Sequence, residues 1–276
     1  MDFMIALLLE AIVASSVSGG ICGYLGVYLQ RLKLITLGFA VAHGALAGAS
    51  IAIMMGCNVE ILAFAFGILI AMTIETLHAK FNVERDLASM FLFSFSSAVA
   101  IIAIYLTPTM LLTSDIASLL LWGSILVITL GKIILLLAIL AAMLIYTRAF
   151  CLELNSLLFD SKLAESEGIN IEFHAMALIV FSAGIISVML RFIGGLLLFS
   201  MIFGPAVSAT TVTHRRQALV GALVGSAAGI FGVLVSFYFD LPIGATIALS
   251  IITSSIVVAV VSRLYHNFRI RRLLNY

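Results

Sequence analysis

The long apolar stretches of this chain limit its fold more than any other feature of the sequence. A helix needs about 20 mostly apolar residues to cross the hydrocarbon core of a bilayer. Such a segment must be helical unless it belongs to a closed barrel, because lipid offers backbone groups no hydrogen-bond partner. The chain lacks the short polar–apolar alternation of barrel strands. We count nine stretches: 4–28, 35–56, 59–79, 87–106, 117–146, 172–190, 192–212, 217–238 and 243–264.

The composition is typical of a membrane protein and argues against a soluble one. Hydrophobic residues make up 63% of the 276 residues and charged residues only 10%, whereas a soluble domain carries roughly 25% charged residues. We therefore predict an all-α bundle with about eight or nine transmembrane spans, forming one transmembrane domain over 1–276. The boundary between the sixth and seventh stretches is the weakest, because only Arg191 marks it.

The basic residues predict the orientation. If nine spans alternate, twelve of the fourteen Lys and Arg residues fall in connections on one side or after the last span. Positively charged loops face the cytoplasm. We expect a multi-pass protein of the cell membrane with its N-terminus outside and its C-terminus in the cytoplasm.

The longest predicted cytoplasmic loop, 148–173, contains a candidate short helix over 157–168. Asp160 suits its N-cap, Ala164 its interior and Gly168 its C-terminal stop. A short amphipathic helix between two spans can dock a cytoplasmic partner, or it can be an ordinary surface loop. The pattern alone leaves both interpretations open.

Ionisable residues inside the spans are the best functional leads, because burying them in lipid is expensive. His43 lies in the second span, where an imidazole can bind a metal, carry a proton or bond to a backbone carbonyl in the core. Asp240 follows the eighth span and can be a ligand or can cap the ninth helix. Glu10 and Lys132 can form a pair.

The sequence has no P-loop, no HExxH motif and no GxSxG motif, which are signatures of nucleotide-binding and hydrolytic sites. We therefore predict a protein that is not an enzyme. An intramembrane enzyme stays as an alternative, although no nucleophile motif in the sequence favours it.

Several segments resemble the permease subunits of the zinc/manganese-type ABC importers. These are, in chain order, GVYLQRLKLITLGFAVAHGALAG, VERDLASMFLFSFSSAVA, SLLLWGSIL, LLFDSKLAESEGI, FIGGLLLFSMIFGPAVSA and SFYFDLPIGATIAL. The resemblance implies a fold like that of type II ABC importers. The implied partners are two cytoplasmic ATPase subunits docked through Asp160, Ala164 and Gly168, a second permease copy, an extracytoplasmic metal-binding protein and lipid, with no nucleic acid.

The chain departs from the family pattern G-D-x-x-S-H in its second span. Phe39 stands at the position of the acid and Ala42 at that of the serine. The resemblance leaves His43 and Asp240 as metal contacts. Because manganese prefers oxygen ligands, the loss of the acid weakens the manganese interpretation more than the zinc one. We favour zinc, with manganese or iron as other possible ions.

We therefore expect a transported divalent ion and no tightly bound cofactor, with ATP hydrolysed by a separate subunit. Import of a metal chelate and ion-coupled secondary transport remain alternatives.

Overall fold

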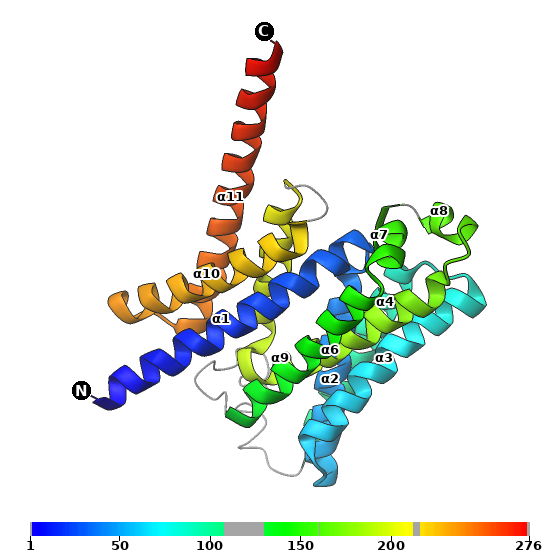
Figure 1. Ribbon diagram of the computed structural model, residues 1–276. Coiled ribbons are helices and arrows are strands. Elements are labelled where there is room, and N and C mark those ends of the chain that lie inside the picture. The colour runs from blue at the N-terminus through cyan, green and yellow to red at the C-terminus, as the bar shows by residue number, and fades with distance from the viewer. Residues whose placement is uncertain (1, 108–129, 160, 212–215, 275–276) are drawn as a thin grey trace. The chain divides into compact units, whose positions relative to one another are not determined.

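The computed structural model describes residues 2–107, 130–159, 161–211 and 216–274 (Figure 1). Every regular element in these ranges is a helix. The helices are α1 (Asp2–Arg31), α2 (Ile35–Met55), α3 (Val59–Phe81), α4 (Arg85–Leu106), α6 (Leu130–Ala149), α7 (Cys151–Phe159), α8 (Ser161–Ser166), α9 (Ile171–Ala209), α10 (Gln217–Phe239) and α11 (Ile243–Leu274).

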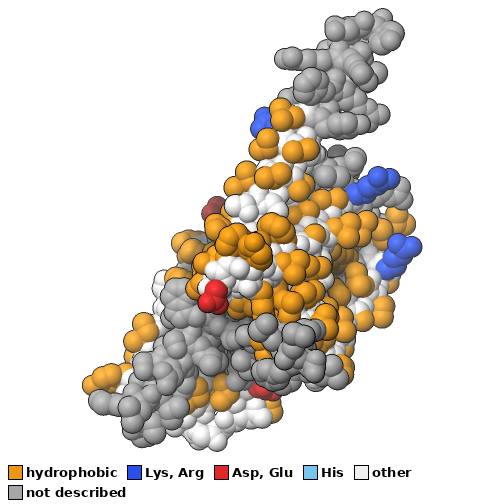
Figure 2. Space-filling model, turned by 90° about the vertical axis from the view of Figure 1, so that its left-hand side faces the viewer, with side chains coloured by type: hydrophobic (Ala, Val, Ile, Leu, Met, Phe, Trp, Pro, Cys, Tyr) orange, Lys and Arg blue, Asp and Glu red, His pale blue; other side chains and the backbone are white. Residues whose placement is uncertain are grey.

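The described helices confirm the predicted class of fold. They provide eight segments long and apolar enough to cross a membrane, two of them (Ile171–Leu190 and Phe192–Ala209) in α9, and a ninth results if α6 and α7, bent by 82°, form one span. Hydrophobic side chains dominate the face drawn in Figure 2, as expected for a surface that meets lipid. The first part of the predicted fifth span, 117–129, lies outside the described residues.

The chain divides into two compact units. Unit 1 comprises 1–30, 124–128 and 196–276, and unit 2 comprises 31–123 and 129–195. Helix α9 contributes to both, and its regular conformation breaks at Gly194, with φ 75° and ψ 162°. The two candidate spans in α9 meet at Arg191, as predicted, and the backbone break lies three residues later. Glycine adopts this positive φ without the steric penalty that a side chain brings.

Unit 2 is built around α2, which packs against both α3 and α4. Gly44 and Gly48 admit side chains and backbone of α3, so these two helices approach closely. Toward α4, the Thr36 hydroxyl donates to Asp86 Oδ1 at 2.6 Å. The His43 ring meets Phe93 at 4.3 Å between centroids. Both pairs are separated by 50 positions, so α2 and α4 run parallel in one register.

Unit 1 contains a seam of glycines between α1 and α10. Gly19 faces Gly225 and Gly23 faces Gly221, and a Cβ at any of these positions would meet the backbone of the opposite helix. Small residues spaced by one turn allow this approach in membrane helices. Small-residue packing therefore holds α1 to α10.

The predicted docking segment contains two short helices instead of one over 157–168. Helix α7 ends at Phe159 and α8 covers Ser161–Ser166, while residue 160 is not described. Each helix buries its own apolar residues: Leu154 and Leu157 in α7, and Ala164 in α8. The stop predicted at Gly168 is confirmed, because Gly168 has φ +79° and its N–H donates to the Glu165 carbonyl at 3.0 Å.

Candidate functional site

His43 lies in the middle of α2, in unit 2, and its ring is oriented by its own helix. Its Nδ1 lies 3.0 Å from the carbonyl oxygen of Phe39, one turn earlier. A carbonyl only accepts, so Nδ1 carries a proton, and in the neutral ring Nε2 is then the nitrogen with the lone pair. Among the described residues Nε2 has no hydrogen-bond partner. A ring fixed in this way is arranged as many metal-binding histidines are.

The predicted core interpretation of His43 and its predicted ligand role are thus compatible. One nitrogen makes the backbone bond of a core histidine, and the other remains available. The edge-on contact with Phe93 fixes the plane of the ring from the α4 side. The bond to Phe39 could be predicted from the sequence, because the two residues lie one turn apart on the same helix. The contact with Phe93 could not, because Phe93 lies on another helix.

Asp240 ends α10 in unit 1. Its backbone is left-handed, with φ 52° and ψ 45°, and its N–H donates to the Ser236 carbonyl. Its exposed carboxylate makes no hydrogen bond or ion pair with the described residues. The interpretation of Asp240 as a cap of the last helix is therefore wrong, because it terminates the preceding one. His43 and Asp240 belong to different units, and their shared role stays a prediction.

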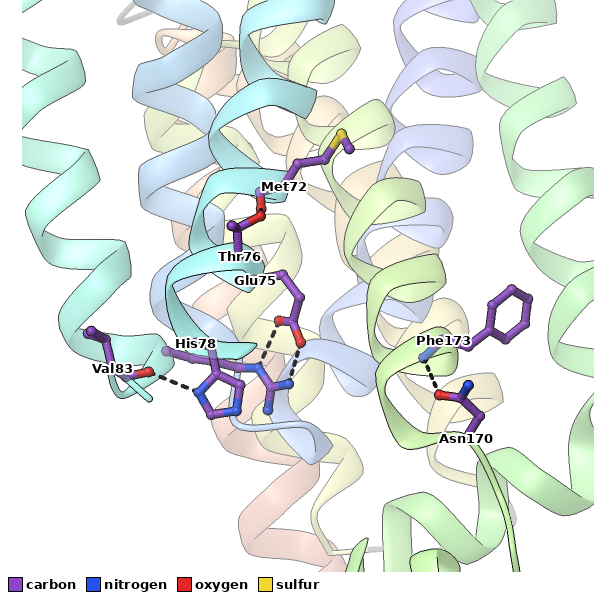
Figure 3. Close-up of polar contacts among 8 residues, drawn as sticks. Met72, Glu75, Thr76, His78, Val83, Asn170 and Phe173 are labelled. Atoms are coloured by element: carbon purple, nitrogen blue, oxygen red, sulfur yellow. Dashed lines mark hydrogen bonds and ion pairs between the residues drawn. The ribbon is translucent and has the colours of Figure 1, made fainter. Parts of the chain in front are cut away.

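A second polar group joins α3 to the start of α4 (Figure 3). Arg85 donates from Nε to Glu75 at 2.9 Å and from a terminal nitrogen at 2.6 Å. The Glu75 side chain is only 4% exposed, against 25% for Arg85. In the turn between the helices, His78 Nδ1 donates to the Val83 carbonyl at 2.9 Å. Each oxygen of the Glu75 carboxylate thus has a hydrogen-bond partner, and the contacts fix the α3–α4 turn.

A third polar contact joins the two helices that flank the segment with α7 and α8. The Tyr146 hydroxyl of α6 lies 2.7 Å from Nδ1 of His174 in α9, which is buried. The ring of Phe150 packs against both side chains. At the start of α9, Asn170 caps the helix by accepting the Phe173 N–H at 3.0 Å, as Figure 3 shows. The helices before and after the segment are thus tied together.

The other predicted residues make fewer described contacts. Asp160 lies outside the described residues, Ala164 is buried, and Gly168 is exposed at the end of α8. Glu10 is exposed on α1, and the side chain of Lys132 is not described, so their pairing stays a prediction. Within the described ranges, no three His, Cys, Asp or Glu residues form a cluster that could hold a metal ion.

These features are those of a polytopic helical membrane protein with few polar groups inside its spans. Sequence comparison identifies its family. The sequence profile of the ABC 3 transport family matches residues 4–263. The chain belongs to the ABC 3 transport family. It is therefore a membrane transport permease of the ABC transporter class, as the resemblance in its sequence predicted.

Named transport proteins and a solved structure align with most of the chain. A probable iron transport system membrane protein of Haemophilus influenzae is 26% identical over 87% of this chain and 83% of its own length. A manganese transport system membrane protein of Listeria monocytogenes is 26% identical over 87% and 85%. The structure of PsaBC from Streptococcus pneumoniae in complex with Fab has a TM-score of 0.76, 22% identity, and coverage of 91% and 90%.

Proposed function

We propose that this chain is the membrane-spanning subunit of an ATP-driven importer of a divalent transition-metal ion. The observation that carries the proposal is the match of the ABC 3 transport family to nearly the whole chain. The names of the iron and manganese transport relatives support a metal ion as substrate. Zinc remains the ion that the donor set of this chain favours, because an imidazole is available and the family acid is replaced by Phe39.

In this proposal His43 contacts the ion during its passage, through the nitrogen that the bond to Phe39 leaves free. A transported ion must bind weakly enough to leave, so a single neutral imidazole suits a transit contact better than a storage site. Asp240 is the proposed acidic contact in the other unit. No resident cofactor is part of the proposal.

The energy would come from two ATPase subunits that dock on α7 and α8 from the cytoplasm. The Tyr146–His174 bond supports the assignment, since it ties together α6 and α9, the helices before and after this segment. A second permease copy and an extracytoplasmic metal-binding protein complete the proposed importer. The segment lies on the side with most Lys and Arg, so the N-terminus is outside and the C-terminus inside.

The test is uptake of radioactive zinc, manganese and iron by the complete complex in proteoliposomes, with ATP inside or outside. We expect ATP-dependent uptake in the wild type. His43→Ala should lower the kcat/KM for the ion by about tenfold or more, as expected when a ligand is lost from a transport site.

The matched control is His78→Ala, which removes another ring bonded to a backbone carbonyl, in this case in the α3–α4 turn. We expect it to change uptake by less than about threefold, because one such bond contributes about 1 kcal/mol at most to the fold. Uptake that follows an ion gradient without the ATPase would identify a secondary transporter instead. Equal losses in both variants would remove His43 from the ion pathway.

A further inference from the structure

Two serines of α4, Ser89 and Ser96, are buried without a hydrogen-bond partner among the described residues. Their exposed fractions are 0% and 2%. A helical serine ordinarily satisfies itself by donating to the carbonyl one turn earlier. Ser94 and Ser97 of the same helix do so, at 3.1 Å to Met90 and 2.7 Å to Phe93. The α4 serine pair, Ser89 and Ser96, is therefore not explained by its helical backbone.

Two other buried serines also lack a partner, but glycines account for both. Ser187 lies against Gly67, and Ser255 lies against Gly204, where in each case the hydroxyl fills space that a missing Cβ leaves. Neither Ser89 nor Ser96 is among the nearest neighbours of the glycines whose surroundings the structure describes. A buried hydroxyl with neither a partner nor a packing reason calls for a missing ligand, such as water or an ion.

The register of α2 and α4 places the α4 serine pair beside His43. Phe93 contacts the His43 ring, and the two serines lie four residues before it and three residues after it, on the same side of the helix. The offset of 50 positions also sets Ser89 level with Phe39. Helix α4 buries this face chiefly against α2.

Building on the proposed function, we propose that Ser89 and Ser96 line the ion route of unit 2 together with Nε2 of His43. In this chain Phe39 occupies the position of an acid, and the neighbouring helix supplies hydroxyl oxygens at the same level. The donor set is therefore one imidazole nitrogen and two neutral hydroxyls.

This donor set defines the substrate class. Neutral ligands cannot replace the whole water shell of a divalent ion, because they leave its charge uncompensated in a low dielectric. The seam between α2 and α4 thus receives a partly hydrated cation that accepts an imidazole. Ions of borderline softness, such as zinc and ferrous iron, accept nitrogen more readily than manganese does.

The first test compares alanine variants of α4 in the complete complex. Ser89→Ala and Ser96→Ala should each lower kcat/KM for zinc uptake by about fivefold, and the double variant by about twentyfold, since each removes one ion contact. Ser94→Ala and Ser97→Ala are the matched controls, because their hydroxyls already bond to the helix. A purely structural role predicts the reverse: removing an unsatisfied hydroxyl stabilises the chain and leaves uptake unchanged.

The second test reads water access directly. Ser89→Cys and Ser96→Cys are placed in a Cys57→Ser, Cys151→Ser background, which keeps only the buried Cys22. During ATP turnover, a small cationic methanethiosulfonate reagent should label both new thiols, and zinc should protect them. A cysteine at 94, on the exposed side of the α4 span, is the control that should stay unlabelled with or without zinc, because that side meets lipid.

The outcomes separate this inference from the proposed function. Wild-type metal uptake, with alanine variants that transport normally and thiols that stay unlabelled, would overturn the role of the α4 serine pair and leave the importer intact. A wild-type complex that moves no metal under ATP would overturn both. Slower zinc uptake in both alanine variants, with zinc-protected labelling, supports the inference.

Discussion

Unit 2 contains two polar groups that differ in their hydrogen bonding. At the α3–α4 turn, the Glu75 carboxylate receives both arms of the Arg85 guanidinium. Between α2 and α4, the Nε2 of His43 and the α4 serine pair have no partner among the described residues. The first group is saturated, and the second has unused donors and acceptors.

This difference in hydrogen bonding distinguishes polar groups that stabilise the fold from polar groups that are available to bind a ligand. Satisfied buried polar groups rigidify a structure, whereas an unsatisfied group destabilises it by about 1–3 kcal/mol. A chain keeps such groups where function needs them. The saturated pair should therefore control stability, and the unsaturated group should control transport and selectivity.

The largest expected effect on stability comes from Arg85→Ala. It leaves the Glu75 carboxylate buried and unpaired, which we expect to lower the free energy of unfolding by about 3 kcal/mol. Denaturant titration of the purified chain in detergent measures the change. Arg148→Ala, which removes an exposed arginine, is the control and should change stability by less than about 0.5 kcal/mol.

Selectivity decides whether Arg85 is only structural. The zinc-to-manganese uptake ratio of the surviving Arg85→Ala complex should equal that of the wild type. A changed ratio would place the saturated pair on the ion route and break the contrast drawn above. Glu75→Gln combined with Arg85→Gln should recover part of the lost stability, because neither residue is then a buried, unpaired charge.

A smaller effect is expected from Tyr146→Phe. It removes the hydroxyl that bonds to the buried His174 and should destabilise the chain by about 1–2 kcal/mol. The double variant with His174→Phe should regain most of this stability, because no unpaired group remains. If the double variant is less stable than the single one, the aromatic packing with Phe150 matters more than the hydrogen bond.

Much of the fold could be predicted from the sequence because membrane helices need long apolar stretches. The span boundary at Arg191 was predicted, but the backbone break at Gly194 was not, although two successive glycines stand there. The division of the 157–168 helix was also missed. Leu157 is buried in α7, whereas the sequence pattern placed it in one helix together with the residues of α8.

The candidate site was predicted only in its local parts. His43 stood out because an ionisable residue in an apolar span is expensive, and Phe39 lies one turn from it on the same face. The ion pair of Glu75 with Arg85 joins two helices, and no local pattern in the sequence predicts it. The α4 serine pair gave no signal beyond its spacing. Its relation to His43 depends on the register of α2 with α4, which no local pattern contains.

The smallest prediction tests that register. Thr36→Val removes the hydroxyl that donates to Asp86 at the end of the α2–α4 contact, and should lower stability by about 0.5 kcal/mol. The control, Thr76→Val, removes a hydroxyl bonded to Met72 of its own helix, a contact drawn in Figure 3. In Asp86→Ala, Thr36→Val should have no further effect, since the two changes remove one interaction. Additive losses would mean that Thr36 and Asp86 do not interact, and would weaken the alignment that sets Ser89 level with Phe39.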